Sequence, residues 1–265
     1  LDAFGYRGSG EVTGVLMDTL FAPGTTHDIY EIEEFVAEGR EAHVYRGKTL
    51  DSKTLDTRTV ALKIYKLDVP NERARRELSA LSRIESSYVV RPQYFGHWRN
   101  ERYFLVMDYI EGETMRSLIE KGERPNDDEF RSVALCLMEA VSAFHNCRDD
   151  DGNLSPLLHC DIKPDNIIIT KDKKPVLFDC TLAGESRVEA FQGTRDYVPP
   201  DSVLGSDVQL TQTSDLYALG VTLWEWLLGQ KPYSMASVGA TPKIPVEFDT
   251  LPEHLRAWLL KAVAT

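Results

Sequence analysis

Residues 159–166, with the sequence HCDIKPDN, place a carboxylate, a lysine and an asparagine between two short apolar runs at 157–158 and 167–169. Short apolar runs bounded by polar residues are typical of buried strands, so we expect the polar residues to occupy a tight loop at a sheet edge. A further strand-like run at 175–178 leads to Asp179. The fold must therefore bring several polar side chains together near that second carboxylate.

Asp161 and Asp179 are separated by strand-like segments, so both can lie on one side of a small sheet. Two carboxylates that converge repel each other unless a cation or phosphate accompanies them, which makes a purely structural role hard to justify. Phosphoryl transfer uses this set: a carboxylate for the attacking hydroxyl, a cation for the transferred phosphate, and an asparagine with a second carboxylate for metal ions. The pattern indicates phosphoryl-transfer chemistry.

These residues resemble the catalytic loop and metal-binding Asp of eukaryotic-type protein kinases, whose signatures are H-R-D-L-x-x-x-N and D-F-G. The resemblance implies that Asp161 is the base, that Lys163 lies beside the γ-phosphate, and that a lysine at this position marks the serine/threonine form. It also implies that Asn166 and Asp179 are ligands of Mg²⁺, or alternatively of Mn²⁺, in an ATP complex.

Two departures from the kinase pattern matter. Cys160 replaces the Arg that in many kinases contacts a phosphate on the activation segment, so the chain resembles the non-RD form. Without that cation, activation by phosphorylation loses its usual receiver, and we predict activity that does not depend on it. Residues 180–181, Cys-Thr, replace the Phe-Gly that normally follows the metal-binding Asp, and the missing Phe would pack beneath a helix.

Strand-like patterns occupy the first half of the chain, at residues 29–36, 42–47, 59–65, 88–90 and 102–107. An intervening helix is predicted at residues 71–84. The resemblance therefore implies an α+β, two-lobed fold with a small five-stranded antiparallel N-lobe that carries one helix, and a larger, mainly helical C-lobe.

The resemblance implies that Lys63, which lies mid-strand in V-A-L-K, holds the ATP phosphates and pairs with Glu77 on the predicted helix. Glu72 is the rival partner, but its place near the helix start suits the helix dipole better. Residues 37–44, AEGREAHV, keep only the middle glycine, Gly39, of the three in the phosphate-covering pattern G-x-G-x-x-G-x-V. Taken alone, this segment is an ordinary hairpin turn.

The resemblance also implies an adenine pocket closed at the back by Met107 and a hinge at residues 108–110. The ATP-contacting positions are then Val36, Gly39, Val44, Ala61, Lys63, Met107, Asp108, Ile110 and Ile168.

The second half of the chain is predominantly helical in pattern. Residues 126–147 form an amphipathic helix capped by Asn126, with an apolar face at Phe130, Val133, Ala134, Leu137, Met138, Val141 and Phe144. Residues 213–229 are apolar on nearly all sides, which predicts a buried helix. A last helix is expected after a cap at Thr250.

Two further motifs extend the resemblance into this half. Residues 193–201 resemble the G-T-x-x-Y-x-A-P-E close of the activation segment, which implies that Thr194 lies near the catalytic Asp161 and Lys163. The helix at 213–229 resembles the kinase S-D-x-x-x-x-G helix, in which Asp215 would bond the catalytic-loop backbone.

We expect residues 1–27 to be an extension of unknown role, with packing on the next domain preferred over a disordered linker. The resemblance implies a kinase domain at residues 28–265, with an N-lobe at 28–108 and a C-lobe at 109–265 that lacks the family's final helices. The chain begins at Leu1 and stops inside an expected helix, so we expect a segment of a larger multidomain chain.

A net charge of −12 argues against a nucleic-acid partner, and no apolar run is long enough to span a membrane. Four cysteines without C-x-x-C spacing suit a reducing compartment, so a cytoplasmic location is expected.

The predicted function is a serine/threonine protein kinase that acts on protein substrates with ATP. A pseudokinase that serves as a nucleotide-binding or scaffold module is the first alternative, because the glycines and the D-F-G motif are altered. A small-molecule kinase of the aminoglycoside-phosphotransferase type is the second alternative, although residues 193–201 and 214–220 would not be expected in it.

Overall fold

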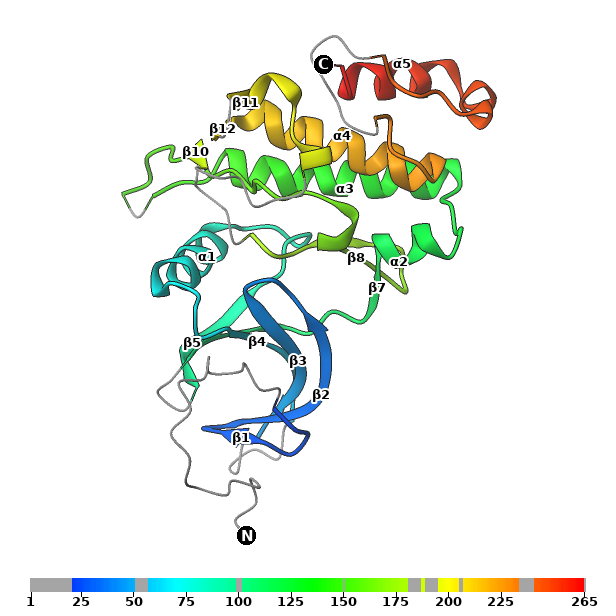
Figure 1. The fold of residues 1–265 in the computed structure, drawn as a ribbon. Coiled ribbons are helices and arrows are strands. Elements are labelled where there is room, and N and C mark those ends of the chain that lie inside the picture. The colour runs from blue at the N-terminus through cyan, green and yellow to red at the C-terminus, as the bar shows by residue number, and fades with distance from the viewer. Residues whose placement is uncertain are drawn as a thin grey trace, which may run out of the picture.

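The computed structural model describes residues 21–50, 57–98, 102–149, 151–180, 187–188, 195–204, 207–233 and 241–264, which form two lobes (Figure 1). In the N-lobe a curled antiparallel sheet has the strand order β1-β2-β3-β4-β6-β5, and helix α1 lies against it. The elements are β1 (Thr26–His27), β2 (Tyr30–Glu38), β3 (Ala42–Thr49), β4 (Thr59–Tyr65), α1 (Asn71–Arg83), β5 (Pro92–Trp98) and β6 (Arg102–Asp108).

The predicted five-stranded sheet is wrong in number and in one strand. The two-residue strand β1 adds a sixth strand beside β2, and residues 92–98, rather than the predicted 88–90, pair with β6. Residues 88–90 instead contact the other lobe, where the Leu177 amide donates to Tyr88 and the Val90 amide donates to Leu177. Their apolar character therefore reflects burial between the lobes and not membership of the sheet.

Part of the predicted N-terminal extension packs on the N-lobe. The Phe21 amide donates to the Tyr45 hydroxyl at 3.1 Å, and the Phe21 ring lies 5.4 Å from that of Trp98. These contacts cover a small apolar cluster on the sheet face that includes Ile32 and Phe104. For residues 21–27, packing on the domain is the observed arrangement.

The C-lobe is built around two long helices, α3 and α4, which lie side by side (Figure 1). A small sheet with the strand order β7-β8-β9 lies between them and the N-lobe. The main elements are β7 (Gly112–Thr114), α2 (Met115–Glu120), α3 (Asp127–His145), β8 (Ile167–Thr170), β9 (Pro175–Leu177), α4 (Gln212–Leu228) and α5 (Glu253–Ala262). Short strands β10 (Arg187–Val188), β11 (Val203–Leu204) and β12 (Asp207–Gln209) form a third sheet, and 3-10 turns span Pro164–Asn166, Arg195–Tyr197, Pro200–Ser202 and Val246–Thr250.

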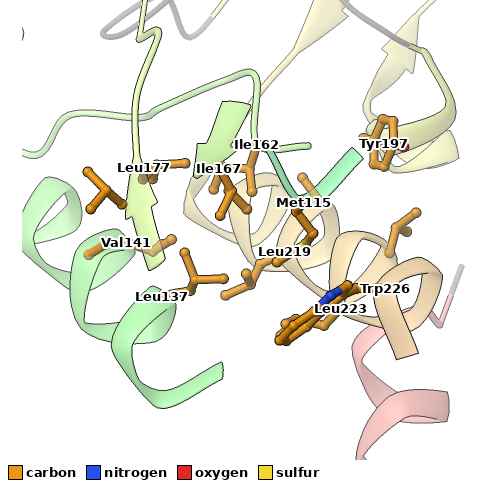
Figure 2. Packing of buried hydrophobic residues seen from close by; sticks show 14 of the residues in the cluster. Met115, Leu137, Val141, Ile162, Ile167, Leu177, Tyr197, Leu219, Leu223 and Trp226 are labelled. Carbon is orange, nitrogen blue, oxygen red and sulfur yellow. The ribbon is translucent and has the colours of Figure 1, made fainter. Parts of the chain in front are cut away.

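Helix α4 is buried almost all round, as predicted, and its side chains interlock with those of α3 and the small sheet (Figure 2). Leu137 and Val141 of α3 face Leu219 of α4 in this packing. At Gly220 an added Cβ would lie 2.8 Å from the Ala262 carbonyl oxygen, so the close approach of α5 requires glycine there. Helix α4 therefore packs closely against both α3 and α5 in the core of the C-lobe.

Three local predictions need correction. Met138 is 37% exposed, unlike the six other residues assigned to the apolar face of α3. The apolar pair 157–158 is not a strand, because the Leu157 amide donates to Phe144 at the end of α3. Thr250 does not cap α5, which begins after Pro252, and its hydroxyl donates to the Glu247 carbonyl instead. Asn126, in contrast, does cap α3 and accepts from the Glu129 amide at 3.0 Å.

All four cysteines, which lie within the described residues, carry free thiols. No helix in the described part of the chain combines the length and apolar composition that crossing a bilayer requires.

Candidate functional site

A cleft of about 660 Å³ opens between the two lobes. The hairpin β2–β3 and strand β4 line it from the N-lobe, and the segment 161–168 with the end of β9 lines it from the C-lobe. Its lining includes every described residue that the sequence assigned to ATP, metal or catalysis: Val36, Gly39, Val44, Ala61, Lys63, Glu77, Met107, Asp108, Ile110, Asp161, Lys163, Asn166, Ile168 and Asp179. Residues far apart in sequence thus meet in one place.

Lys63 joins three elements at the back of the cleft. Its Nζ donates to both carboxylate oxygens of Glu77, at 2.8 and 2.7 Å, and to Asp179 Oδ1 at 2.8 Å. The predicted Lys63–Glu77 pair is therefore present, and Glu77 is fully buried. Burial would lower the pKa of Lys63, but the carboxylates of Asp179 and Glu77 reverse this and raise it well above its ordinary value. The ammonium stays charged and faces the cleft from β4.

Asp161 is held by two side chains of its own loop. Lys163 Nζ donates to Asp161 Oδ2 at 2.7 Å, and Asn166 Nδ2 donates to the same oxygen at 3.0 Å and to the Asp161 carbonyl at 2.8 Å. The 3-10 turn at Pro164–Asn166 brings the three residues together, as a tight loop requires. Burial raises the pKa of Asp161, while the Lys163 ammonium opposes that rise.

Asp215, at the start of α4, holds the backbone of this loop through hydrogen bonds. Its carboxylate accepts the backbone amides of His159 at 3.0 Å and Cys160 at 2.9 Å, as the motif predicted, and it contacts His145 Nε2 at 2.9 Å. Asp215 is almost completely buried, so these donors replace its hydration. Helix α4 thereby fixes the loop backbone that carries Asp161.

Cys160 and Asp179 both have left-handed backbone conformations, with φ of 67° and 61°. Such angles are uncommon for residues with a side chain and cost on the order of 1–3 kcal/mol. Strained residues of this kind gather at functional sites, where surrounding contacts hold them in place. Cys160 directly precedes Asp161, and Asp179 is itself the second carboxylate of the cleft.

The Cys160 side chain is buried and carries no positive charge. Burial, with the Asp215 carboxylate nearby, raises the pKa of its thiol well above the ordinary value. Position 160 therefore supplies neither a cation nor a reactive thiolate.

The hairpin above the cleft is closed by its own backbone. The Gly39 amide donates to the Ala42 carbonyl at 2.8 Å. Lys66, which directly follows β4, donates from its Nζ to Glu38 Oε1 at 2.8 Å. Gly39 has no left-handed φ, and an added Cβ would meet only the Ala42 oxygen, at 3.2 Å. The hairpin-turn interpretation describes this geometry, and residues of the hairpin line the cleft.

The oxygen atoms at the mouth of the cleft suit a hard divalent cation. The partly exposed carboxylate of Asp179 lines the cleft, and Asn166 retains its amide oxygen because its nitrogen makes the hydrogen bonds. No cluster of three or more His, Cys, Asp or Glu side chains forms a metal site among the described residues. Two protein oxygens combined with substrate phosphates are the usual way to bind Mg²⁺, so the residues fit.

Sequence reasoning missed an ion-pair network on the C-lobe side. Arg116 of α2 donates to Glu225 of α4 at 2.8 and 3.3 Å and to the Tyr197 hydroxyl at 2.8 Å, and it contacts Asp165 at 3.3 Å. Tyr197 also donates to Glu225, at 2.5 Å. A glutamate near the end of a largely apolar buried helix was the available signal, because such a charge needs a partner. The network ties Asp165 of the catalytic loop to Tyr197, within the residues that resemble the close of the activation segment.

Thr194, assigned to the catalytic group, lies outside the described residues, and so do Thr181 and Ser186, two hydroxyl residues that follow Asp179 and could be phosphorylated.

Comparisons with known proteins agree with this geometry. The protein kinase domain pattern matches residues 30–247. Serine/threonine-protein kinase A of Synechocystis is 32% identical over 222 residues, covering 77% of this chain and 41% of that protein. Serine/threonine-protein kinase PrkC of Bacillus subtilis is 26% identical over 255 residues, covering 89% and 37%. MAP kinase kinase MKK1/SSP32 of Saccharomyces cerevisiae is 27% identical over 195 residues, covering 70% and 34%. The chain thus spans less than half the length of each of these relatives.

Proposed function

Because this chain belongs to the protein kinase domain family, we propose that it transfers the γ-phosphoryl group of ATP to serine or threonine hydroxyls of protein substrates. The observation that carries the proposal is the meeting of two charge groups in one cleft. Lys63, Glu77 and Asp179 form one group, and Asp161, Lys163 and Asn166 form the other.

Each group supports a separate part of the reaction. Lys63 would hold the α- and β-phosphates, and Lys163 would offset charge on the transferred phosphoryl group. Asp161 would orient the substrate hydroxyl and accept its proton. Apolar side chains on both walls, such as Val44 and Ala61 above and Ile168 below, would enclose the adenine. By resemblance, Thr194 would adjoin the same site.

We propose Mg²⁺ as the metal, held by Asn166 and Asp179. A bound divalent ion supplies neutralisation of phosphate charge during transfer. The lysines and Asp161 do the positioning, which accounts for much of the catalysis in enzymes of this kind. Residues 28–108 and 109–265 would form the two lobes around this site, and a cytoplasmic location stays a prediction.

Labelling with radioactive ATP in the presence of Mg²⁺ tests the function against both alternatives. The chain is incubated with a casein-like protein acceptor and, separately, with an aminoglycoside. We expect phosphoserine or phosphothreonine on the protein acceptor or on the chain itself. Binding of Mg·ATP without transfer to any acceptor would favour the pseudokinase, and label on the aminoglycoside alone would favour the small-molecule kinase.

We further propose that the domain is of the non-RD type, because position 160 supplies a buried neutral thiol where a phosphate receiver would need a cation. Thr181, Ser186 and Thr194 are each replaced by Ala, one at a time, and separately by Glu. We expect that no activity lost in an Ala variant is restored by Glu at the same position. Kinase assays on phosphatase-treated protein measure this. A phosphosite whose loss is rescued by Glu would contradict it.

Replacing Lys163 by Met is expected to shift the acid limb of the pH profile of kcat/KM toward higher pH. The Lys163 ammonium lowers the pKa of Asp161, so its removal lets burial raise that pKa further. Since Asp161 must be ionised to accept a proton, activity is lost at a higher pH as the solution is acidified. Rates between about pH 4 and pH 8 measure the limb.

Lys171→Met is the matched control, because Lys171 is an exposed lysine in the turn after β8 and should leave the limb in place. A limb that stays fixed or moves to lower pH in Lys163→Met would contradict the assigned contact.

A further inference from the structure

Tyr65 lies beside the Lys63–Glu77 pair and has no part in the function proposed above. It is the last residue of β4, is 2% exposed, and donates a short hydrogen bond from its hydroxyl to Glu77 Oε2. Lys63 and Tyr65 are two residues apart on one strand, so their side chains leave the same face of the sheet. One strand thus contacts one carboxylate of α1 with two different donors.

The buried carboxylate explains why a second donor matters. Glu77 has no exposed surface, so protein donors must replace all of its hydration. Lys63 supplies two of these contacts but is also bonded to Asp179, and it would have to reach the ATP phosphates as well. Among the described residues, the Tyr65 hydroxyl is hydrogen-bonded only to Glu77. It can therefore keep the Glu77 carboxylate oriented when Lys63 engages a phosphate.

The surroundings hold the Tyr65 ring in position. Ala42 is directly opposite Tyr65 in the β3–β4 register, and its small side chain leaves space for the ring on that face. The ring centroid lies 5.4 Å from Lys63 Nζ, within the range of a cation–π contact. Tyr65, Leu81 of α1 and Cys180 belong to one buried apolar cluster. The hydroxyl of Tyr65 adds a polar link between the sheet and helix α1 within this cluster.

We propose that Tyr65 is a positioning residue that acts through Glu77 to hold the Lys63 ammonium in place for the ATP phosphates. The inference rests on the proposed kinase activity and adds to it a tyrosine hydroxyl that braces the Lys–Glu pair.

Tyr65→Phe tests the inference in the 265-residue chain, because it removes the hydroxyl and keeps the ring. A hydrogen bond to a charged group contributes enough for about a tenfold fall in kcat/KM for ATP. We expect the fall in kcat, with KM for ATP changed less than about twofold, since the adenine contacts remain. Tyr45→Phe is the control: Tyr45 is equally buried in the same lobe but lies in the cluster on the other sheet face, and its hydroxyl accepts from the Phe21 amide. It should leave kcat and KM unchanged.

A double-mutant cycle with Glu77→Gln separates positioning from a general effect on the fold. If Tyr65 acts through Glu77, Tyr65→Phe will cause little further loss of kcat in the Glu77→Gln background. An equal loss in both backgrounds, or wild-type kcat in Tyr65→Phe, would overturn the inference while leaving the kinase function intact. Absence of phosphoryl transfer by the wild-type chain would overturn the proposed function and this inference with it.

Discussion

Replacing Asp161 by Asn is expected to lower kcat for phosphoryl transfer by about 10²- to 10⁴-fold, the usual contribution of a positioned general base. Asn has the same shape but accepts no proton at neutral pH. It also removes the anion that Lys163 and Asn166 hold at 2.7 and 3.0 Å, so the substrate hydroxyl loses its acceptor. The measurement is the rate of transfer to a protein acceptor at saturating ATP.

The same substitution should not unfold the domain. Burial raises the pKa of Asp161, so the native state binds this proton more tightly than the unfolded chain does. The contribution of this group to stability is therefore full below its ordinary pKa and falls as pH rises through the raised value. At neutral pH the buried charge costs native-state free energy, and Asn removes that charge. The thermal midpoint of Asp161→Asn should equal or exceed that of the wild type.

Asp172→Asn serves as the control, because Asp172 is exposed in the turn between β8 and β9. It should keep both the wild-type rate and the wild-type thermal midpoint. Activity of Asp161→Asn above about a tenth of the wild-type rate would exclude Asp161 as the general base. A large fall in its thermal midpoint would instead contradict the cost assigned to its buried charge.

The charge pairs of the site could be predicted because the resemblance to protein kinases named the partners, and a physical rule agrees with each pair. A lysine inside an apolar strand needs a carboxylate, and Glu77 lies on the inward face of the next helix, whereas Glu72 lies at its start. Asp215 could likewise be assigned, because a buried helix that begins with a carboxylate requires donors, and the resemblance named them. In both cases the resemblance supplied the partner, and the cost of an unpaired buried charge agrees with it.

Other features depend on contacts that no short segment encodes. Residues 88–90 have the composition of a strand, yet their hydrogen bonds run to Leu177 in the other lobe. The Arg116 network joins side chains 49, 81 and 109 positions apart, and only the folded chain shows that they converge. The role of Tyr65 could not be predicted from the sequence, because an aromatic residue at a strand end is expected in any apolar core. Where the interacting residues are distant in sequence or of a common type, the sequence alone offers no basis for choosing which residues interact.

Replacing Asp215 by Ala is expected to destabilise the domain and nearly abolish activity. The carboxylate accepts two backbone amides, at 3.0 and 2.9 Å, in a site without solvent. Each buried amide left without an acceptor costs about 1–3 kcal/mol, so the total is about 2–6 kcal/mol of unfolding free energy. That loss is a large fraction of the 5–15 kcal/mol typical of a domain.

The effect on activity has its own cause. Cys160 has a left-handed backbone that costs roughly 1–3 kcal/mol, and the bond from its amide to Asp215 helps to hold it there. Without that bond the loop can relax, and Asp161, the next residue, leaves its position. Asp215→Asn keeps one acceptor oxygen, so it should show a smaller loss of both stability and rate than Asp215→Ala.

Urea unfolding and transfer rates for the two variants measure the graded effect. Asp249→Ala provides the comparison, because Asp249 is exposed and contacts Arg256 only at 3.5 Å, so it should change the unfolding free energy by less than about 0.5 kcal/mol. If Asp215→Ala unfolds at the wild-type urea concentration, the two amides have found other acceptors and the anchor role is wrong. If it is destabilised but retains the wild-type rate below the unfolding transition, the loop holds Asp161 without α4, and the strain at Cys160 must be balanced within the loop itself.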